Sequence, residues 1–274
     1  MYIHLDSINS KNLDQLNFLH NQFNKNNNYK SVPTHIDKDS ETIENCKNYN
    51  SVLILDTETT GLDENKDEVI EVGCILFNVP SKAVLSQLSF LLPVSSNKAE
   101  DINGISPLVS NCKQPWEESV TLFLKLVECS DLIIAHNVEF DRKWFGRGQL
   151  PQLNKNWVCS LEDINWSFKK KLKSRPSVTD LALAFGVPVW NLHRALADCY
   201  YLSEVFKKCE NLDNLLLEAT QPKHLYRAIV SYEERSLAKN AGFRWNSPVQ
   251  GAWTRKLSPN EAIKLDFRVE ILKK

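Results

Sequence analysis

Short apolar runs separated by polar turns organise the middle of this 274-residue chain. Residues 52–55 are all apolar and predict a buried strand, and Gly61 marks the turn that follows it. Residues 68–78 and 83–92 predict two further strands, and only a short turn separates them. Because short connections favour antiparallel pairing, we expect three antiparallel strands at the start of this domain.

Strands then alternate with helices. Apolar residues at helical spacing predict helices over residues 115–127, 138–145, 178–185 and 194–208. Two short apolar runs between these helices predict a fourth strand over residues 132–135 and a fifth over residues 157–160. The order predicts an α/β fold, a ribonuclease-H-like mixed sheet of three antiparallel strands followed by parallel strands, flanked by helices.

Carboxylates follow the first strand and recur later in the chain. Asp56 and Glu58 are two residues apart, so their side chains leave an extended strand on the same face. Two crowded carboxylates repel each other unless a proton or cation compensates, and oxygen-rich clusters are what Mg²⁺ and Mn²⁺ prefer. A lone D-x-E is typical of a solvated loop, so the metal-site interpretation depends on further acids. Asp141 and Asp198 supply them, each in a predicted helix.

Three motifs in order carry a family resemblance. They are D-T-E-T-T-G at 56–61, A-H-N-V-E-F-D at 135–141 and H-R-A-L-A-D at 193–198. Together they resemble the DEDDh branch of the DnaQ-like 3′–5′ exonucleases, over about residues 51–210, and within it most of all the exonuclease X group. The sister branch carries Tyr four residues before the last Asp, where this chain has Arg194.

The resemblance implies a set of catalytic residues. Asp56, Glu58, Asp141 and Asp198 would bind two divalent cations, Mg²⁺ or Mn²⁺, and His193 would be the general base that takes a proton from water. The implied reaction is hydrolysis of phosphodiester bonds from the 3′ end of single-stranded DNA, with release of nucleoside 5′-monophosphates.

Residues beside these motifs and in basic segments are candidates for substrate contact. The basic run at 169–175 is either a solvated surface or a phosphate-contacting loop at the rim of the site. The candidates are Thr57, Thr59, Asn137, Phe140, Lys171, Lys173, Arg244 and Trp245.

The charge is unevenly divided along the chain. The composition, 42% hydrophobic and 24% charged, is ordinary for a globular protein, and the net charge is −1. Residues 221–274 hold 11 Lys and Arg against 5 Asp and Glu, whereas residues 1–220 hold 22 against 29. Acid therefore concentrates where metals would be held, and base concentrates where phosphates could be met.

The segments before and after the predicted exonuclease domain (51–210) differ from it in composition and predicted structure. Residues 1–50 predict a short helix followed by an Asn-rich linker or arm. Residues 222–274 predict a small basic α+β module, which resembles a domain of uncharacterised function found in DNA-processing proteins. Its interleaved aromatic and basic residues fit stacking on single-stranded bases. Alternatively, its two Trp residues at 245 and 253 both form the core of a very small domain.

The hydropathy and the cysteines of the chain indicate its cellular environment, and two alternative functions remain open. No apolar run approaches a membrane span, and seven scattered cysteines without a C-x-x-C pair favour free thiols in the cytoplasm. One alternative is an RNA-trimming 3′–5′ exoribonuclease, because a metal site does not distinguish the sugars. Another is a non-catalytic nucleic-acid-binding protein on the same scaffold. A polymerase or repair partner is also left open.

Overall fold

The computed structural model describes residues 49–166, 172–173, 175–190 and 193–272. The predicted N-terminal helix and nearly all of the Asn-rich arm lie outside this part, as does Lys171. None of the described helices is long and apolar enough to cross a membrane.

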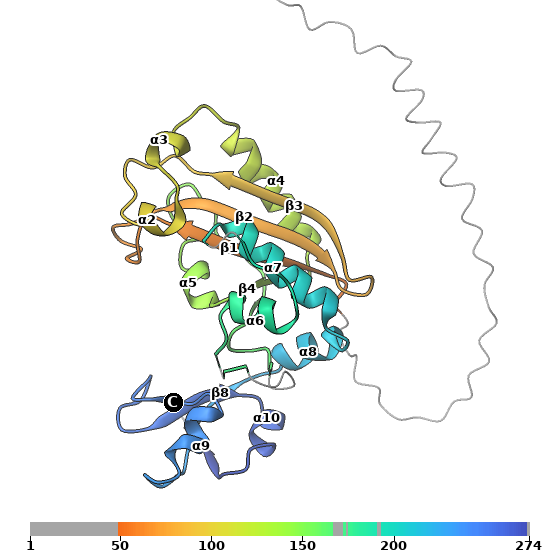
Figure 1. Ribbon diagram of the computed structural model, residues 1–274, viewed down its shortest axis with the longest axis vertical. Helices are drawn as coiled ribbons and strands as arrows, with labels where there is room; N and C mark the ends of the chain where they lie inside the picture. Colours follow the sequence, from red (N-terminus) through yellow and green to blue (C-terminus); the bar gives the residue numbers. More distant parts are fainter. Residues whose placement is uncertain (1–48, 167–171, 174, 191–192, 273–274) are drawn as a thin grey trace, which may run out of the picture. The chain divides into compact units, whose positions relative to one another are not determined.

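A five-stranded mixed sheet forms the main body, as predicted (Figure 1). Its strands lie in the order β3-β2-β1-β4-β5. β1 pairs with β2, and β2 with β3, in antiparallel fashion, whereas β1–β4 and β4–β5 are parallel. The bounds are β1 Ser51–Thr59, β2 Val69–Asn78, β3 Ala83–Leu91, β4 Leu132–Ala135 and β5 Trp157–Cys159.

Helices cover both faces of this sheet because its central strand is apolar on both sides. Val52 and Ile54 of β1 pack with α6 (Val178–Ala184), α7 (Ala195–Lys208) and α8 (Leu212–Ala219). Leu53 and Leu55, on the opposite face, pack with Phe123 of α4 (Trp116–Cys129). Figure 1 shows α7 lying across one face of the sheet. Three short helices complete this part: α2 (Glu100–Asn103), α3 (Pro107–Ser110) and α5 (Val138–Arg142).

Two element bounds differ from the sequence prediction in ways that matter for the site. β1 continues beyond residue 55 to Thr59, because β2 supplies backbone partners for the polar residues as well as the apolar ones. The acids Asp56 and Glu58 therefore lie within a paired strand. α5 ends at Arg142 instead of 145, and the chain then turns so that Trp144 and Phe145 enter the core.

The C-terminal module (residues 222–274) contains a second, antiparallel sheet in the order β7-β8-β6-β9. Tyr226, Phe243 and Leu257 form its small core, against which Trp253 packs. Ser258 and Glu261 form a capping box at the start of α10. The bounds are β6 His224–Ala228, α9 Arg235–Asn240, β7 Arg244–Trp245, β8 Trp253–Leu257, α10 Pro259–Ile263 and β9 Val269–Ile271.

Candidate active site

The first turn of α7 lies directly on the backbone of β2. Gly73 of β2 is opposite Asp56 of β1, and a Cβ atom built on Gly73 would lie 2.3 Å from the backbone nitrogen of Leu196. A side chain at this position would therefore push α7 away from the sheet. This close approach places Asp198, one turn into α7, above the acids of β1.

Three carboxylates meet at this point. Asp56, Glu58 and Asp198 each offer an oxygen atom, and these oxygens all lie within 4.8 Å of one another. Burial and the neighbouring Asp198 carboxylate raise the pKa of Glu58 to about 8, and burial raises the pKa of Asp198 to about 6. Burial and the charge of Asp141 also raise the pKa of Asp56. The raised pKa values mean that ionisation of the three carboxylates is unfavourable when nothing neutralises their charge. A hard divalent cation, which prefers oxygen ligands, would neutralise it.

Asp141 lies beside this group and is held by β1. It is buried at 1% exposure, and its Oδ1 accepts hydrogen bonds from the Thr57 backbone N–H at 3.0 Å and from the Thr57 hydroxyl at 2.8 Å. Burial raises the pKa of Asp141 to about 7, although both bonds from Thr57 oppose the shift. Asp141 of α5 is thus bonded to β1, the strand that carries Asp56 and Glu58. It is not one of the three residues whose oxygens lie within 4.8 Å of one another.

His193 is exposed at the lead-in to α7. The helix begins at Ala195, so His193 precedes it, as the sequence predicts. Its backbone has a φ of 58°, a left-handed conformation that is uncommon for residues other than glycine. The charge of His193 lowers the pKa of Asp198, while burial has the larger, opposite effect. The imidazole therefore acts electrostatically on the carboxylate cluster.

His136 of the second motif has a structural role. Its Nε2 bonds the Pro176 carbonyl oxygen at 3.0 Å, and its Nδ1 bonds the Ser160 hydroxyl at 2.9 Å. A carbonyl only accepts, so Nε2 carries the proton. Burial lowers the pKa of His136 to about 4, which keeps the ring neutral.

The candidates for substrate contact on β1 and around α5 differ in hydrogen bonding and in exposure to solvent. The hydroxyl of Thr57 is used by Asp141, and that of Thr59 donates to the Gly61 carbonyl at 2.6 Å. Both hydroxyls are thus engaged within the protein, as are the Thr57 backbone N–H, which donates to Asp141, and the Thr59 carbonyl, which accepts from Asn103 Nδ2. Asn137 is exposed just before α5, with a φ of 81°. Phe140 is half-buried and packs edge-on against Trp144.

The basic candidates are partly paired. Lys173 forms an ion pair with Asp180 at 2.8 Å, and Arg244 forms one with Glu162. Trp245 is 52% exposed and packs against Trp253 at a ring-centroid distance of 5.6 Å. The alternative that both Trp residues form the module's core is wrong for Trp245, because half of its surface faces solvent.

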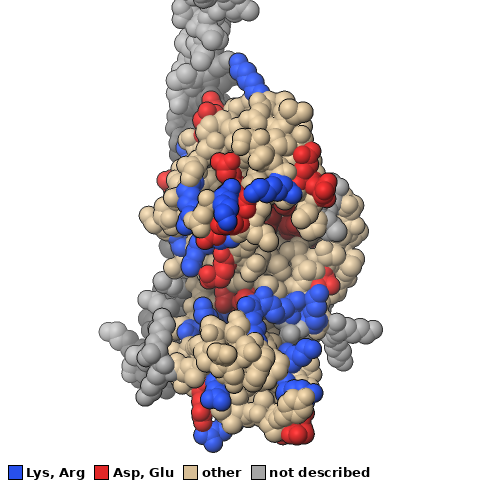
Figure 2. Space-filling view, turned by 90° about the vertical axis from the view of Figure 1, so that its left-hand side faces the viewer, with Lys and Arg blue, Asp and Glu red and all other residues tan. Residues whose placement is uncertain are grey.

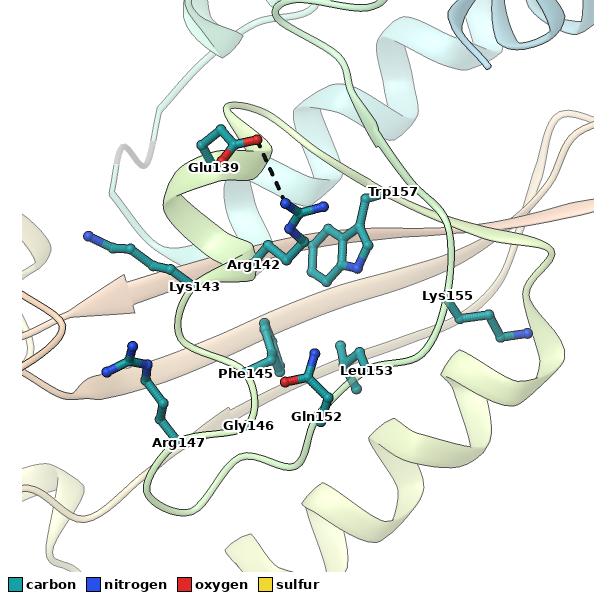
Figure 3. A pocket seen from close by; sticks show the side chains of 10 residues that line it. All are labelled: Glu139, Arg142, Lys143, Phe145, Gly146, Arg147, Gln152, Leu153, Lys155 and Trp157. Atoms are coloured by element: carbon teal, nitrogen blue, oxygen red, sulfur yellow. Dashed lines mark ion pairs between the residues drawn. The ribbon is translucent and has the colours of Figure 1, made fainter. Parts of the chain in front are cut away.

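Two hollows beside α5 were not predicted from the sequence. One, of about 510 Å³, is lined by Arg142, Lys143, Arg147, Lys155 and the face of Trp157, with Glu139 as its only acid (Figure 3). Arg142 and Glu139 are 3.9 Å apart, a long ion pair. The residues that line this first hollow come from α5, the following loop and the start of β5. The folded structure brings their charges to one surface.

The second hollow, of about 310 Å³, lies between α5 and the C-terminal module. Asn137 and Arg142 line one side of it, and Arg244, Arg255 and Lys256 line the other. Figure 2 shows Lys and Arg side chains gathered on the C-terminal module. Glu139, Glu162 and Asp163 also line the second hollow, so its charge is mixed. Arg142 lines both hollows and connects them.

Comparison with known proteins identifies the family. A family model described as "Exonuclease" matches residues 53–206, which is more than half of the chain. The chain belongs to this exonuclease family. The family predicted from the three motifs is thereby confirmed. A second model, a domain of unknown function, matches residues 224–272 in the C-terminal module.

Named relatives of this exonuclease include polymerase proteins. It is 30% identical over 158 residues to the PolC-type DNA polymerase III of Thermotoga maritima, covering 56% of this chain and 11% of that protein. It is also 29% identical over 206 residues to the DNA polymerase III subunit epsilon of Rickettsia prowazekii, covering 65% and 88% of the respective chains. The match to the PolC-type protein thus spans a small part of that relative.

Solved structures with similar folds include two bound to DNA. Exonuclease I of E. coli in complex with a dT13 oligonucleotide has a TM-score of 0.49 and 20% identity, covering 69% of this chain and 50% of that one. Exonuclease X in complex with 5′ overhanging duplex DNA has a TM-score of 0.45 and 22% identity, covering 62% and 99%.

Proposed function

We propose that this exonuclease hydrolyses single-stranded DNA from its 3′ end with two divalent cations, Mg²⁺ or Mn²⁺, and releases nucleoside 5′-monophosphates. The convergence of Asp56, Glu58 and Asp198 carries the proposal, because three half-buried carboxylates with oxygens within 4.8 Å of one another repel each other unless a cation or proton compensates. Asp141, held at β1 through its Oδ1, adds a fourth carboxylate whose Oδ2 would assist the second ion.

Different residues would bind the cations, accept the proton and position the substrate. Asp56, Glu58 and Asp198 would hold the cations, which lower the pKa of water and neutralise charge that develops on the phosphate. His193, exposed at the lead-in to α7, would accept the proton of the attacking water at a ring nitrogen. Thr57 and Thr59 would help to position the terminal nucleotide.

Basic surfaces outside the carboxylate cluster support a polynucleotide substrate. The hollow of Figure 3 and the neighbouring one at the C-terminal module together present Arg142, Arg147, Arg244, Arg255 and Lys256. Cations that follow a strand replace its counterions and so supply affinity that does not depend on sequence. Acids also line the second hollow, and one of them, Glu162, pairs with Arg244, so Arg142, Arg255 and Lys256 are its remaining cations. The exposed ring of Trp245 adds a surface on which a base can stack. We infer that the C-terminal module (222–274) holds the strand outside the 51–210 domain.

The sugar preference separates the proposal from its main alternative. An RNA-trimming enzyme would use the same carboxylates, and only a contact to the 2′-hydroxyl would distinguish the substrates. One observation favours DNA: the named relatives are DNA polymerase III proteins. A polymerase or repair partner and a cytoplasmic location belong to the same proposal.

Digestion of a 5′-labelled oligonucleotide tests the function directly. Single-stranded DNA and matched RNA would be incubated with Mg²⁺ or Mn²⁺ and wild type, Asp198→Ala or His193→Ala. Asp213→Ala and His224→Ala are matched controls, because both residues are exposed and lie in α8 and β6, away from the carboxylates.

We expect a metal-dependent ladder that shortens from the 3′ end of DNA, is lost in both site variants and is kept in both controls. Preferential digestion of RNA would favour the exoribonuclease. Failure to digest either substrate, with oligonucleotide binding intact, would favour the non-catalytic binding protein.

A further inference from the structure

Glu71 of β2 is a buried carboxylate that neither the three motifs nor the metal group includes. We propose that Glu71 is a positioning residue: it fixes the His193–Arg194 segment so that the imidazole is held over the carboxylate cluster. The inference rests on the proposed function, because it concerns the group that accepts the proton.

A bidentate ion pair joins Glu71 to the segment. The Oε2 atom of Glu71 accepts a hydrogen bond from Arg194 Nε at 2.9 Å, and Oε1 accepts one from Arg194 Nη2 at 3.0 Å. The Glu71 side chain is 1% exposed, whereas that of Arg194 is 47% exposed. Two parallel bonds to a planar guanidinium fix its orientation as well as its distance.

Glu71 also caps α7 from a neighbouring strand. Arg194 is the N-cap residue of α7, but its side chain makes no capping hydrogen bond. Instead, Glu71 Oε2 accepts the backbone N–H of Ala195, the first helical residue, at 3.1 Å. A carboxylate at a helix N-terminus satisfies an otherwise unpaired N–H and interacts favourably with the helix dipole.

These contacts distinguish Glu71 from the metal-binding acids. Glu71 is paired with Glu58 in the β1–β2 register, so both side chains leave the sheet on the same face. The Ser89 hydroxyl donates to Glu71 Oε1 at 2.7 Å, so four hydrogen bonds use both oxygens. These four donors occupy the acceptor sites of the carboxylate, so Glu71 does not offer its oxygens to a metal ion.

Loss of the Glu71 contacts should displace His193 more than Asp198, because core packing holds the rest of α7 in place. Cys199, Tyr201 and Leu202 are buried in the core beneath the helix, which fixes the turn that carries Asp198. His193 is exposed and has a left-handed φ of 58°, so its conformation depends on its neighbours. Arg194, held by Glu71, is the neighbour that fixes it.

Steady-state kinetics of Glu71→Gln and Glu71→Ala in the full chain test the inference. We expect kcat to fall by about 10- to 100-fold with KM changed by less than about twofold, since misplacing a catalytic group by about 1 Å costs this much. In the His193→Ala background the same substitutions should lower kcat by no more than about twofold further. Arg194→Lys should retain more activity than Arg194→Ala.

Two measurements separate positioning from a general loss of structure. The charge of Glu71 also acts on Asp56, Glu58 and Asp198, so Mn²⁺ affinity is compared in Arg194→Lys, which keeps both charges of the ion pair. Measured by calorimetry, it should stay within about twofold of wild type if the carboxylate cluster is intact. Glu204→Gln is the matched control, because Glu204 pairs with Lys207 on the same helix at 2.6 Å. It should lower the melting temperature at most slightly and leave kcat unchanged.

Distinct outcomes would overturn the inference or the proposed function. A folded Glu71→Gln with wild-type kcat would overturn the inference, and so would a loss that adds fully to that of His193→Ala. If Glu71→Ala does not fold, Arg194→Ala and Glu71→Gln give the same comparison. A wild-type protein that digests no nucleic acid would instead contradict the proposed function.

Discussion

Thr57 and Asp141, 84 residues apart in the sequence, are joined by two hydrogen bonds to a single carboxylate oxygen. The backbone N–H and the hydroxyl of Thr57 both donate to Asp141 Oδ1. β1 thus supplies two acids of the proposed metal site and also fixes the orientation of a third acid that comes from α5.

Thr57→Val should weaken this connection while keeping the shape of the side chain. The variant loses the hydroxyl bond, worth about 1.5–3 kcal/mol for a charged acceptor, but keeps the backbone bond. Because the lost bond lowers the pKa of Asp141, that pKa should rise above about 7. We expect lower kcat and an acid limb of the pH–rate profile displaced to higher pH.

Thr220→Val is the matched control, because its hydroxyl donates to backbone carbonyls of α8. It should leave the profile unchanged. An unchanged profile in Thr57→Val as well would show that the hydroxyl does not control Asp141.

The stability of the metal-free protein should decrease as pH rises. The folded-state pKa of Glu58 is about 8 and that of Asp198 about 6, both above their unfolded values. The native state therefore binds more protons than the unfolded state between about pH 4 and 8, and loses this advantage as pH rises through that window. Melting temperatures with chelator should fall across the window.

Divalent cations should reverse this trend. Mn²⁺ binds the deprotonated cluster, so it should raise the melting temperature more at pH 8 than at pH 5.5. Glu58→Gln removes one of the titrating acids and should flatten the metal-free dependence. Equal metal stabilisation at both pH values would contradict a cation site in this cluster.

Substitution of the basic hollow beside α5 should weaken strand binding without abolishing chemistry. Arg142→Gln with Arg147→Gln removes two exposed cations from its lining. If both meet phosphates, the slope of log K against log salt should decrease by about 1.4 in magnitude for a single strand. Fluorescence anisotropy with a labelled 20-nucleotide DNA at several salt concentrations measures this slope.

Lys125→Gln, an exposed cation on α4, is the control and should leave the slope unchanged. Hydrolysis of a dinucleotide, which carries few phosphates for the hollow to contact, should be less affected by the double substitution than hydrolysis of the 20-nucleotide strand. A slope equal to that of wild type would exclude these arginines from the strand path.

The two tryptophans of the C-terminal module should respond differently to truncation. Trp245 is half-exposed, so Trp245→Ala should weaken single-strand binding by about 1–3 kcal/mol with little loss of stability. Trp253 packs against the module's core, so Trp253→Ala should chiefly lower the melting temperature. Tyr232→Ala, at a 74% exposed ring, is the binding control. Unchanged DNA affinity in Trp245→Ala would remove base stacking from the proposal.

Gly73→Ala should displace α7 from the sheet. The added Cβ would lie 2.3 Å from the Leu196 nitrogen and 2.4 Å from the Ala195 carbonyl carbon, both backbone atoms that cannot rotate away. Overpacking of this kind costs about 1–3 kcal/mol, which urea unfolding would measure. Activity should also fall, because Asp198 moves with the helix. An unchanged unfolding midpoint would contradict the close packing of α7 on β2.

The sequence determined the order of elements and the identity of the exonuclease motifs. Apolar runs at 52–55 and 132–135 mark strands because a buried strand excludes polar side chains. It did not reveal that β1 extends to Thr59, since the pairing of its polar residues depends on β2. It also missed α8, whose apolar face is explained only by the core that it covers.

The tertiary structure alone decided how the acids relate to one another. Spacing on β1 placed Asp56 and Glu58 on one face, but the approach of Asp198 depends on the glycine contact between β2 and α7. Glu71 has no signal in the sequence that sets it apart from the other acids of its segment. Only folding gives it Arg194 and the helix N–H as partners, because those groups are more than 120 residues away.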